Sequence, residues 1–387
     1  MKRSSRYIPY GRQWIDQKDI SSAISVLKSD FITQGPKVKE FEDKIADYCG
    51  AKYAVAVSSG TAALHIACLA AGIKKGDEVI TTPISFVASA NCILHCSGEP
   101  IFADVQEDTI NINPTEVEKK ITKRTAAIIP VDFAGHPCDL GEIQKIAKRH
   151  NLMVIEDACH ALGAKYRGTR IGSCDFSDMT VFSFHPVKHI TTGEGGMVLT
   201  NRKDLYKELI TLRNHGIVRS RTDLLNKNEG SWYYEMQDLG FNYRITDFQC
   251  ALGISQLEKL ERFIKRRRQI AGKYHKELSK ISGLILPVEK DYAKSSWHIY
   301  VITVNRKREK IYNELSKKGI SVNVHYRPIY LHPFYKRLGY KEGLCPKAER
   351  YYKEAITIPL YPAMHEDEIN YIVTNLKKIV NNLKRLQ

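Results

Sequence analysis

Residues 179–196 read MTVFSFHPVKHITTGEGG and place a lone lysine between an apolar run and a cluster of glycines. The run MTVFSF is bulky enough to form a buried strand, whereas three glycines within four residues are typical of a loop. Lys188 is therefore predicted to lie at the exit of a strand. A solvated charge would be unusual at that position.

MTVFSF is the last of five short β-rich runs, and helical patterns fall between most of them. The runs are YAVAV at 53–57, DEVITT at 77–82, TAAIIPV at 125–131, LMVIE at 152–156 and MTVFSF at 179–184. The helical patterns lie at 37–50, 60–71, 87–96, 114–121 and 139–149. Regular alternation of this kind predicts an α/β fold with a mostly parallel central sheet.

The pattern changes near residue 246. Residues 245–281 are predicted to form one long helix broken only by Gly253. After it come a strand candidate at 297–304, a helix at 307–318, a short strand ISVNVHY at 320–326 and a terminal amphipathic helix. We expect a large α/β domain with an N-terminal arm over residues 1–245 and a smaller α+β domain over 246–387, joined firmly by the long helix.

Composition limits the classes of protein that fit this chain. Its 387 residues are 43% hydrophobic, with no signal-peptide pattern and no apolar run long enough to span a bilayer, so we expect a cytoplasmic protein. The nine cysteines form no CxxC pair and show no repeat spacing, so the sequence indicates neither a disulfide framework nor a zinc ribbon. Cys92, His95 and Cys96 could share a helix face, but three ligands in apolar surroundings favour buried core residues, and no metal site is predicted.

The positive charge is concentrated in the second part of the chain. Residues 1–200 hold 23 Lys+Arg and 23 Asp+Glu, whereas residues 201–387 hold 36 Lys+Arg and 20 Asp+Glu. The second part therefore carries the whole net charge of +16. Such asymmetry suits nucleic acid, an anionic membrane or a diphosphate-bearing metabolite as partner. The densest run, KLERFIKRRR at 259–268, is interpreted as a solvated helix face.

Two further strand exits carry polar residues. Ser58, Ser59, Gly60 and Thr61 follow YAVAV and begin a helix, where free backbone N–H groups suit a phosphate, although Ser and Thr are also ordinary N-caps. Asp157 follows an apolar strand, where a buried carboxylate needs a cation or a donor. The alternative is that Asp157 caps the next helix.

A phosphate cradle, a carboxylate and a lysine at neighbouring strand exits match pyridoxal 5'-phosphate (PLP). A lysine can hold this cofactor covalently, a carboxylate can keep its ring nitrogen protonated, and a helix N-terminus can hold its phosphate. The glycines at 193, 195 and 196 would let backbone pack close to the site.

Six motifs distributed over nearly the whole chain resemble the DegT/DnrJ/EryC1/StrS family of sugar aminotransferases. They are SSGTAAL, GDEVITTPISFVASAN, VIEDACHALGA, FSFHPVKHITTGEGG, GFNYRITDFQCALG and VHYRPIYLHPFY. The resemblance implies the PLP-dependent transferase fold of aspartate aminotransferase (type I) and a homodimer with shared active sites.

The resemblance also implies roles for individual residues. Lys188 would carry the cofactor and Asp157 would pair with its ring nitrogen. Gly60, Thr61 and Ser183 would bind the phosphate, with Asn242 reaching over from the second subunit, and Phe86 would stack on the ring.

His160 stands where the family often has glutamine, and it resembles the subgroup that acts on UDP-linked 4-keto hexoses in pseudaminic acid synthesis. The ITTPISFVA segment indicates the same subgroup. His160 could be a core histidine, but a spacing of three from Asp157 places it about one helical turn away and favours contact with the cofactor ring. The expected reaction moves an amino group from glutamate to the 4-keto carbon of a UDP-linked 2-acetamido-2,6-dideoxy hexulose.

The acceptor's diphosphate needs cations, and arginine is well suited to clamp phosphate. The candidates in the basic second part are Arg213, Arg219, Arg221, Arg244 and Arg327. Tyr326 and Arg327 in VHYRPIYLHPFY are the expected sugar contacts, with a proline-bounded structural loop as the alternative for this stretch.

The sequence is also compatible with other functions. The acceptor could be a 3-keto or dTDP-linked sugar. A sugar dehydratase of the same fold would carry histidine in place of the anchoring lysine, whereas this chain has Lys188 flanked by His185 and His189. A non-enzymatic protein that binds nucleic acid or membrane through the basic part would need a binding motif that is not apparent, so neither partner is expected.

Overall fold

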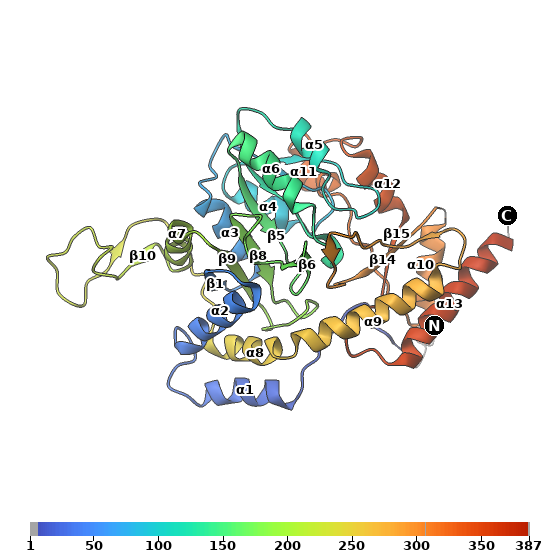
Figure 1. Ribbon diagram of the computed structural model, residues 1–387, viewed down its shortest axis with the longest axis horizontal. Coiled ribbons are helices and arrows are strands. Elements are labelled where there is room, and N and C mark those ends of the chain that lie inside the picture. Colours follow the sequence, from blue (N-terminus) through green and yellow to red (C-terminus); the bar gives the residue numbers. More distant parts are fainter. Residues whose placement is uncertain (1–6, 306, 386–387) are drawn as a thin grey trace.

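The computed structural model describes residues 7–305 and 307–385. Residues 1–6, at the start of the predicted N-terminal arm, and residues 306, 386 and 387 lie outside the described residues. Figure 1 shows a central sheet flanked by helices, a long helix α9 that runs from the sheet toward the C-terminal elements, and a hairpin at β10 that projects from the body.

A seven-stranded sheet forms the centre of the molecule in the order β1-β9-β8-β5-β4-β2-β3. Its strands are β1 Tyr53–Val57, β2 Glu78–Thr81, β3 Glu99–Phe102, β4 Thr125–Ile129, β5 Met153–Asp157, β8 Met179–Ser183 and β9 Gly196–Thr200. Only β9 within this sheet runs antiparallel to its neighbours, so the prediction of a mostly parallel sheet is confirmed. The carboxyl ends of the other strands therefore lie along one edge.

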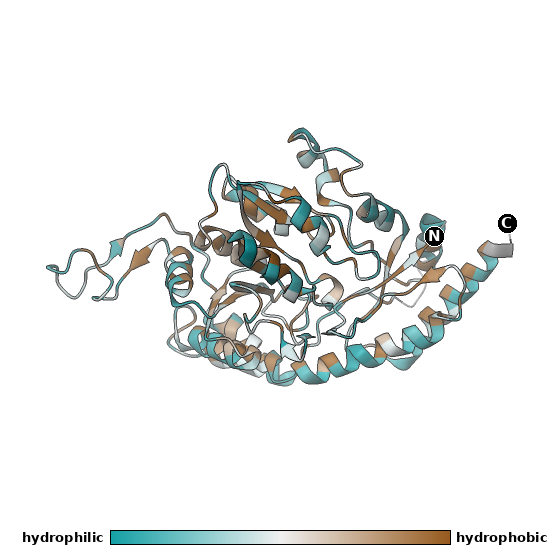
Figure 2. Ribbon diagram, turned by 45° about the horizontal axis from the view of Figure 1, so that its top comes forward, coloured by the Kyte–Doolittle hydropathy of each residue, from teal (hydrophilic) through white to brown (hydrophobic). Residues whose placement is uncertain are grey.

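Helices cover both faces of the sheet, as the alternating sequence pattern predicts. One face is covered by α3 Gly60–Ala70, α4 Ala88–His95 and α7 Lys203–Arg213. The other face is covered by α2 Pro36–Cys49, α5 Pro114–Lys119, α6 Leu140–His150, α8 Asp247–Leu257 and α9 Leu260–Leu278. Figure 2 shows hydrophobic strands between helices that turn hydrophilic residues outward.

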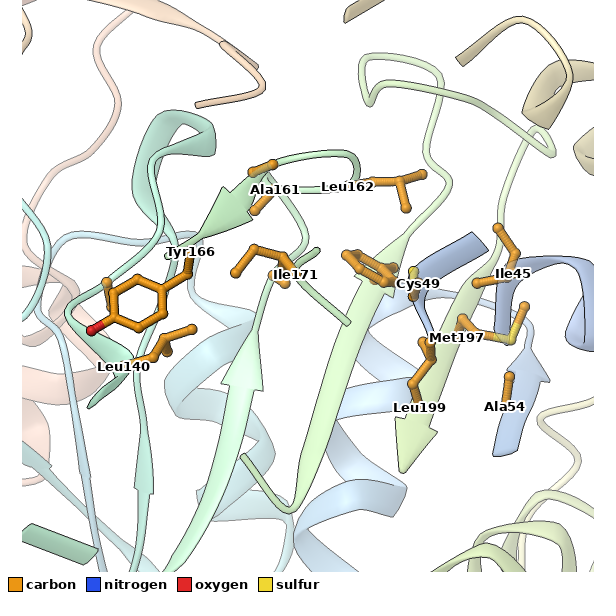
Figure 3. Close-up of a cluster of buried hydrophobic side chains, with 14 of the residues drawn as sticks. Ile45, Cys49, Ala54, Leu140, Ala161, Leu162, Tyr166, Ile171, Met197 and Leu199 are labelled. Carbon is orange, nitrogen blue, oxygen red and sulfur yellow. The ribbon is translucent and has the colours of Figure 1, made fainter. Parts of the chain in front are cut away.

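The larger core lies between the second of these helical layers and the sheet. Figure 3 shows side chains from different elements meeting there, among them Ile45 of α2, Leu140 of α6 and Leu199 of β9. Helix α2 enters this core because its apolar residues recur at helical spacing, and it ends at Gly50, whose φ of +86° suits glycine. The predicted end of this helix at Gly50 is confirmed.

A second hydrophobic cluster lies in the C-terminal part, around a small antiparallel sheet. It is built from β12 Leu284–Ile285, β14 Tyr300–Val304, β15 Ala355–Ile358, α10 Arg308–Lys317 and α13 Glu366–Arg385. The predicted strand at 297–304, the helix at 307–318 and the terminal helix are present. The domain boundary near residue 246 stays a prediction.

The remaining elements are short or peripheral. They are α1 Gln17–Leu27, α11 Pro333–Arg337, α12 Pro346–Glu354, β6 Lys165–Tyr166, β7 Thr169–Arg170, β10 Ile217–Val218, β11 Glu235–Met236, β13 Ala293–Lys294 and two short 3-10 helices, Phe133–Gly135 and Ile329–Leu331.

The prediction of one helix over 245–281, broken only at Gly253, is wrong. Gly253 lies inside α8, and the break falls between α8 and α9, at Glu258 and Lys259. Lys259 forms ion pairs with Asp16 and Asp19 before and within α1, which hold the chain at this turn.

The predicted strand ISVNVHY at 320–326 is also absent. Ile320 and Asn323 form only isolated bridges, to Ile8 and Thr357 respectively. Asn323 exchanges both backbone hydrogen bonds with Thr357, and the chain then leaves the small sheet. The alternating pattern here reflects a buried edge segment rather than a continuous strand.

The prediction of a solvated face at 259–268 is wrong for Arg267, which is 1% exposed. Its Nη1 donates hydrogen bonds to the carbonyl oxygens of Trp297, His298 and Leu360. Arg267 therefore connects α9 to two segments of the C-terminal part.

In the described part of the chain, no helix combines the length and apolar character needed to cross a membrane.

Gly253 and Gly272 provide a matched test of packing between α8 and α2. A Cβ on Gly253 would lie 2.7 Å from the ring of Phe41, whereas a Cβ on Gly272 in α9 would meet nothing within 4 Å. We expect Gly253→Ala to lower the free energy of unfolding by about 1–3 kcal/mol because of overpacking. Gly272→Ala should raise it by about 0.5–1 kcal/mol. Denaturant unfolding measures both, and a stabilising Gly253→Ala would contradict the close α8–α2 contact.

Candidate active site

A cavity of about 710 Å³ opens at the carboxyl ends of the parallel strands. This is the edge at which ligands bind in open α/β sheets. Segments that follow five strands and two stretches of the C-terminal part line the cavity. Its lining includes Ser59, Gly60, Thr61, Ser85, Phe86, Ser89, Val131, Asp157, Cys159, His160, Ser183, His185, Lys188, His298, His325, Tyr326 and Arg327.

The N-terminus of α3 forms one wall of this cavity. Ser59 is its N-cap, and its Oγ accepts a hydrogen bond of 3.1 Å from the N–H of Ala62, so the ordinary capping role is present. The N–H groups of Gly60 and Thr61 have no acceptor within the helix and lie at the positive end of its dipole. Capping and anion binding are therefore compatible at this helix end.

Close backbone packing holds this helix end beside the strand exits. A Cβ on Gly196 would lie 2.3 Å from the carbonyl oxygen of Ser59, and one on Gly60 would lie 2.8 Å from the Cβ of Ser183. Gly195 is crowded by Thr192, whereas Gly193 has open space and a φ of +83°. The predicted close packing thus applies to Gly195 and Gly196, while Gly193 serves a turn.

Asp157 lies at the floor of the cavity and is 3% exposed. Its Oδ2 accepts a 2.6 Å hydrogen bond from Ser89 Oγ, and its Oδ1 accepts one of 3.2 Å from the N–H of Cys159. Within residues 7–305 and 307–385, Asp157 has no ion-pair partner. No helix begins after it, so the capping alternative is wrong.

A buried carboxylate without a cation is costly unless a positive group approaches it. The protonated ring nitrogen of PLP would be such a group, and the free N–H groups at the start of α3 suit a phosphate. The residues present therefore fit this cofactor.

Lys188 lies in the turn between β8 and β9, where its N–H donates to the carbonyl oxygen of His185. Its side chain is partly buried and makes no ion pair with any described residue. Burial lowers the pKa of the Lys188 amine, and the nearby Cys159 and Asp157 partly oppose this shift. A lysine with a lowered pKa can supply the neutral amine that nucleophilic and base chemistry require.

His160 lines the cavity, although not by the helical spacing that the sequence indicates. Residues 158–164 form successive turns rather than a helix. Tyr326 Oη lies 3.4 Å from Nε2 of His160. The ring centroid of His160 lies 4.4 Å from that of His298. Burial and then the charge of Lys188 hold the pKa of His160 well below its ordinary value, so the imidazole is neutral.

Several lining residues were missed by sequence reasoning. Ser89 hydrogen-bonds Asp157 and stands four residues after Ser85, so its helical spacing within ISFVASAN is a signal that could have found it. Tyr10 and His298 come from distant segments without a motif, whereas His325 lies beside Tyr326 in the motif VHYRPIYLHPFY, a signal that could have found it. Tertiary packing alone brings Tyr10 and His298 to the cavity.

The predicted residues Tyr326 and Arg327 lie on the cavity wall, and Phe86 is 58% exposed beside it. Arg327 Nη2 donates to the carbonyl oxygen of Leu331 at 3.0 Å, which orients the guanidinium. The stretch VHYRPIYLHPFY can therefore be a structural loop and also contact a ligand, so the two alternatives do not exclude each other.

The other predicted residues do not line the cavity of their own chain. Asn242 bridges to Asn214, whose side chain accepts a 2.7 Å hydrogen bond from Arg244. Arg213 pairs with Glu42, with 16% of its side chain exposed, and donates to the carbonyl oxygen of Ala56. This geometry makes Arg213 a structural residue and argues against its predicted role as a diphosphate clamp.

Arg219 and Arg221 lie in the projecting hairpin, where the guanidinium of Arg219 lies 4.9 Å from the ring centroid of Tyr234. Among the described residues, no group of three or more His, Cys, Asp or Glu side chains is arranged to hold a metal ion. The thiols of Cys92 and Cys96 are free and buried.

Comparison with known proteins identifies relatives along nearly the whole chain. The model of the DegT/DnrJ/EryC1/StrS aminotransferase family matches residues 13–377. The spore coat polysaccharide biosynthesis protein SpsC of Bacillus subtilis is 40% identical over 98% of this chain and 99% of that protein. The UDP-4-amino-4,6-dideoxy-N-acetyl-beta-L-altrosamine transaminase of Campylobacter jejuni is 39% identical over 98% and 99%.

Solved structures confirm the fold. Helicobacter pylori PseC, described as an aminotransferase involved in the biosynthesis of pseudoaminic acid, superposes with a TM-score of 0.90 at 32% identity, over 97% of this chain and 100% of that one. The sugar aminotransferase Spr1654 of Streptococcus pneumoniae in its PLP form gives a TM-score of 0.90 at 30% identity, over 97% and 99%. The chain therefore belongs to the PLP-dependent DegT/DnrJ/EryC1/StrS aminotransferase family.

Proposed function

We propose that this protein transfers the amino group of glutamate to the 4-keto carbon of a UDP-linked 2-acetamido-2,6-dideoxy hexulose. The observation that carries the proposal is the convergence of Lys188, Asp157 and the N-terminus of α3 on one cavity. The Campylobacter transaminase and Helicobacter PseC support the choice of acceptor. The relation to SpsC, 40% identical, keeps other nucleotide-linked keto sugars as the alternative.

Each residue then has a defined task. When bound, PLP supplies an electron sink that stabilises negative charge at the carbon next to nitrogen. Lys188 holds the cofactor, and once released its neutral amine carries a proton to and from the reacting carbon. Asp157 holds the ring nitrogen protonated through its buried charge.

The remaining cofactor contacts follow from their places on the cavity wall. Gly60, Thr61 and Ser183 lie at the free N–H groups of α3 and are assigned to the phosphate. Phe86 and the neutral His160 are assigned to the ring faces. Asn242 would complete the phosphate site of the neighbouring subunit.

Tyr326 and Arg327 are assigned to the acceptor because they lie on the cavity wall contributed by the C-terminal part. Arg327 is exposed and offers a planar fork for a diphosphate. The other candidate, Arg244, lies two residues from Asn242 and would act from the partner subunit.

A homodimer belongs to this proposal. Large apolar side chains are exposed on α1 and the segment after it, and again on the projecting hairpin, where a monomer would leave them in water. They include Ile24, Leu27, Phe31, Ile32, Leu225, Trp232, Met236 and Leu239. The free cysteines fit a reducing compartment, so the proposed location is cytoplasmic.

The rival functions fit the site less well. Lys188 on the cavity wall disfavours a dehydratase, because the related dehydratases are expected to carry histidine there. A basic binding protein would not need a buried Asp157 that lacks an ion-pair partner among the described residues and lies beside a polar cavity. Consumption of glutamate coupled to amination separates the proposed enzyme from both rivals.

Product identification tests the substrate. The purified protein should convert the UDP-linked 4-keto sugar and glutamate to a 4-amino sugar, as seen by mass spectrometry and NMR, whereas 3-keto and dTDP-linked sugars should react at least about tenfold more slowly. Lys188→Ala, the matched control, should show no turnover. Efficient amination of a 3-keto sugar, with none of the UDP-linked 4-keto sugar, would leave the family intact and overturn the substrate.

Subunit complementation tests the shared site. Lys188→Ala and Asn242→Ala homodimers should each be impaired, and after subunit exchange one site of each heterodimer carries both defects while the other carries neither. Activity should therefore rise on mixing. A mixture that stays as inactive as its parents, with exchange verified by differently tagged subunits, would show that Asn242 serves its own chain.

The lowered pKa of His160 predicts that this residue does not contribute to the pH dependence of catalysis. Because burial keeps this imidazole neutral across the working range, His160→Gln should leave the acid limb of the pH profile of kcat/KM in place. The glutamine should retain activity within about tenfold, since it keeps a polar planar group beside the ring. An acid limb that moves in His160→Gln would mean that this histidine titrates during catalysis.

A further inference from the structure

Two buried carboxyl groups lie beneath the cavity floor, and the proposed reaction uses neither. Asp132 and Glu156 are 0% and 2% exposed. Asp132 Oδ2 and Glu156 Oε1 are both buried, and neither oxygen accepts a hydrogen bond from an N–H group or a hydroxyl group of the described residues. These two side chains are within hydrogen-bonding contact of each other.

The other oxygen of each carboxyl group is satisfied. Asp132 Oδ1 accepts a 2.8 Å hydrogen bond from the N–H of Cys138. Glu156 Oε2 accepts from Thr180 Oγ1 at 2.8 Å and from Ser177 Oγ at 3.1 Å. The two unsatisfied oxygens belong to a contact that is favourable only when a proton lies between them, because two buried carboxylates repel each other.

We propose that Asp132 and Glu156 share one proton, donated by Asp132 Oδ2 to Glu156 Oε1, and that this bond positions Asp157. The pair carries a single negative charge, on Glu156. Its position supports the second part of the proposal, because the backbone N–H of Asp132 donates to the carbonyl oxygen of Asp157 at 3.1 Å, and the N–H of Asp157 donates to the carbonyl oxygen of Pro130 at 2.9 Å.

The chain beyond β4 and the end of β5 are thus held together by backbone bonds and, beside them, by the side-chain pair. Glu156 and Asp157 are adjacent on β5, and their side chains point to opposite faces of the sheet. The Asp132–Glu156 pair therefore holds the strand from one face, while Asp157 faces the cavity on the other. Loss of the bond would free the strand end that aims the Asp157 carboxylate.

The surrounding charges favour a retained proton. The titratable groups that interact with the pair include Cys49, Cys138, Cys174 and Asp157, all of them acids. Arg170 lines a small cavity together with Glu156, but its guanidinium pairs with Glu261, and neither Asp132 nor Glu156 forms an ion pair with a described residue. Burial, and then the charge of Glu156, raise the pKa of Asp132 well above its ordinary value.

Infrared spectroscopy of the cofactor-free protein at pH 8 tests the shared proton, independently of the proposed substrate. The wild type should show the C=O stretch of a protonated carboxylic acid, and Asp132→Asn should lose it, because the Cys138 N–H fixes the amide oxygen and turns the amide nitrogen toward Glu156. Glu208→Gln is the control, since Glu208 is another carboxyl whose pKa is raised by burial, and it should keep the band. No band in the wild type, or a band that survives in Asp132→Asn, would overturn the shared proton.

Cofactor affinity tests the positioning role, which rests on the proposed use of Asp157. Asp132→Ala leaves Glu156 Oε1 without a donor and should weaken PLP binding by about ten- to a hundredfold. Asp132→Asn restores a donor and should bind PLP within about twofold of the wild type. Equal affinity in Asp132→Ala and the wild type, or failure of Asp132→Asn to restore binding, would overturn the positioning role.

Discussion

A buried carboxylate with no ion-pair partner among the described residues is the constraint on which this site depends. Asp157 is 3% exposed and is held by one hydroxyl and one backbone N–H. Two neutral donors offset only part of the cost of burying a charge, so the carboxylate favours a positive group that enters from the cavity. In the proposed function, the protonated ring nitrogen of the cofactor would meet that requirement, and Ser89 and the end of β5 would hold this one side chain in place for it.

Parallel strands then bring the partners of Asp157 together. Thr61, Asp157 and Lys188 are far apart in sequence, but each follows a strand whose carboxyl end lies at the same edge of the sheet. The antiparallel return of β9 brings Gly196 against the backbone of Ser59. A side chain at Gly196 would displace the helix end that offers its N–H groups, so glycine at this position lets the segment that carries Lys188 pack against the N-terminus of α3.

The parts of the site that follow strands were predictable from the sequence, because polar residues after apolar runs are a local signal. His298 carries no such signal, since only the packing of the C-terminal part brings it to the cavity. Local patterns also misled where tertiary contacts decide. Arg267 resembles a solvated helical arginine yet is buried, and Gly253 resembles a helix break yet lies inside α8, where the ring of Phe41 requires a small residue.

The central claim is that Lys188 anchors PLP in this cavity, and borohydride reduction tests it most directly. Reduction of the protein loaded with PLP fixes the cofactor on the lysine that holds it, and peptide mass spectrometry then identifies that residue. The account predicts a pyridoxyl label confined to the peptide that contains Lys188, in an amount matching the bound cofactor. A label on another lysine, or none in protein that binds PLP, would contradict it.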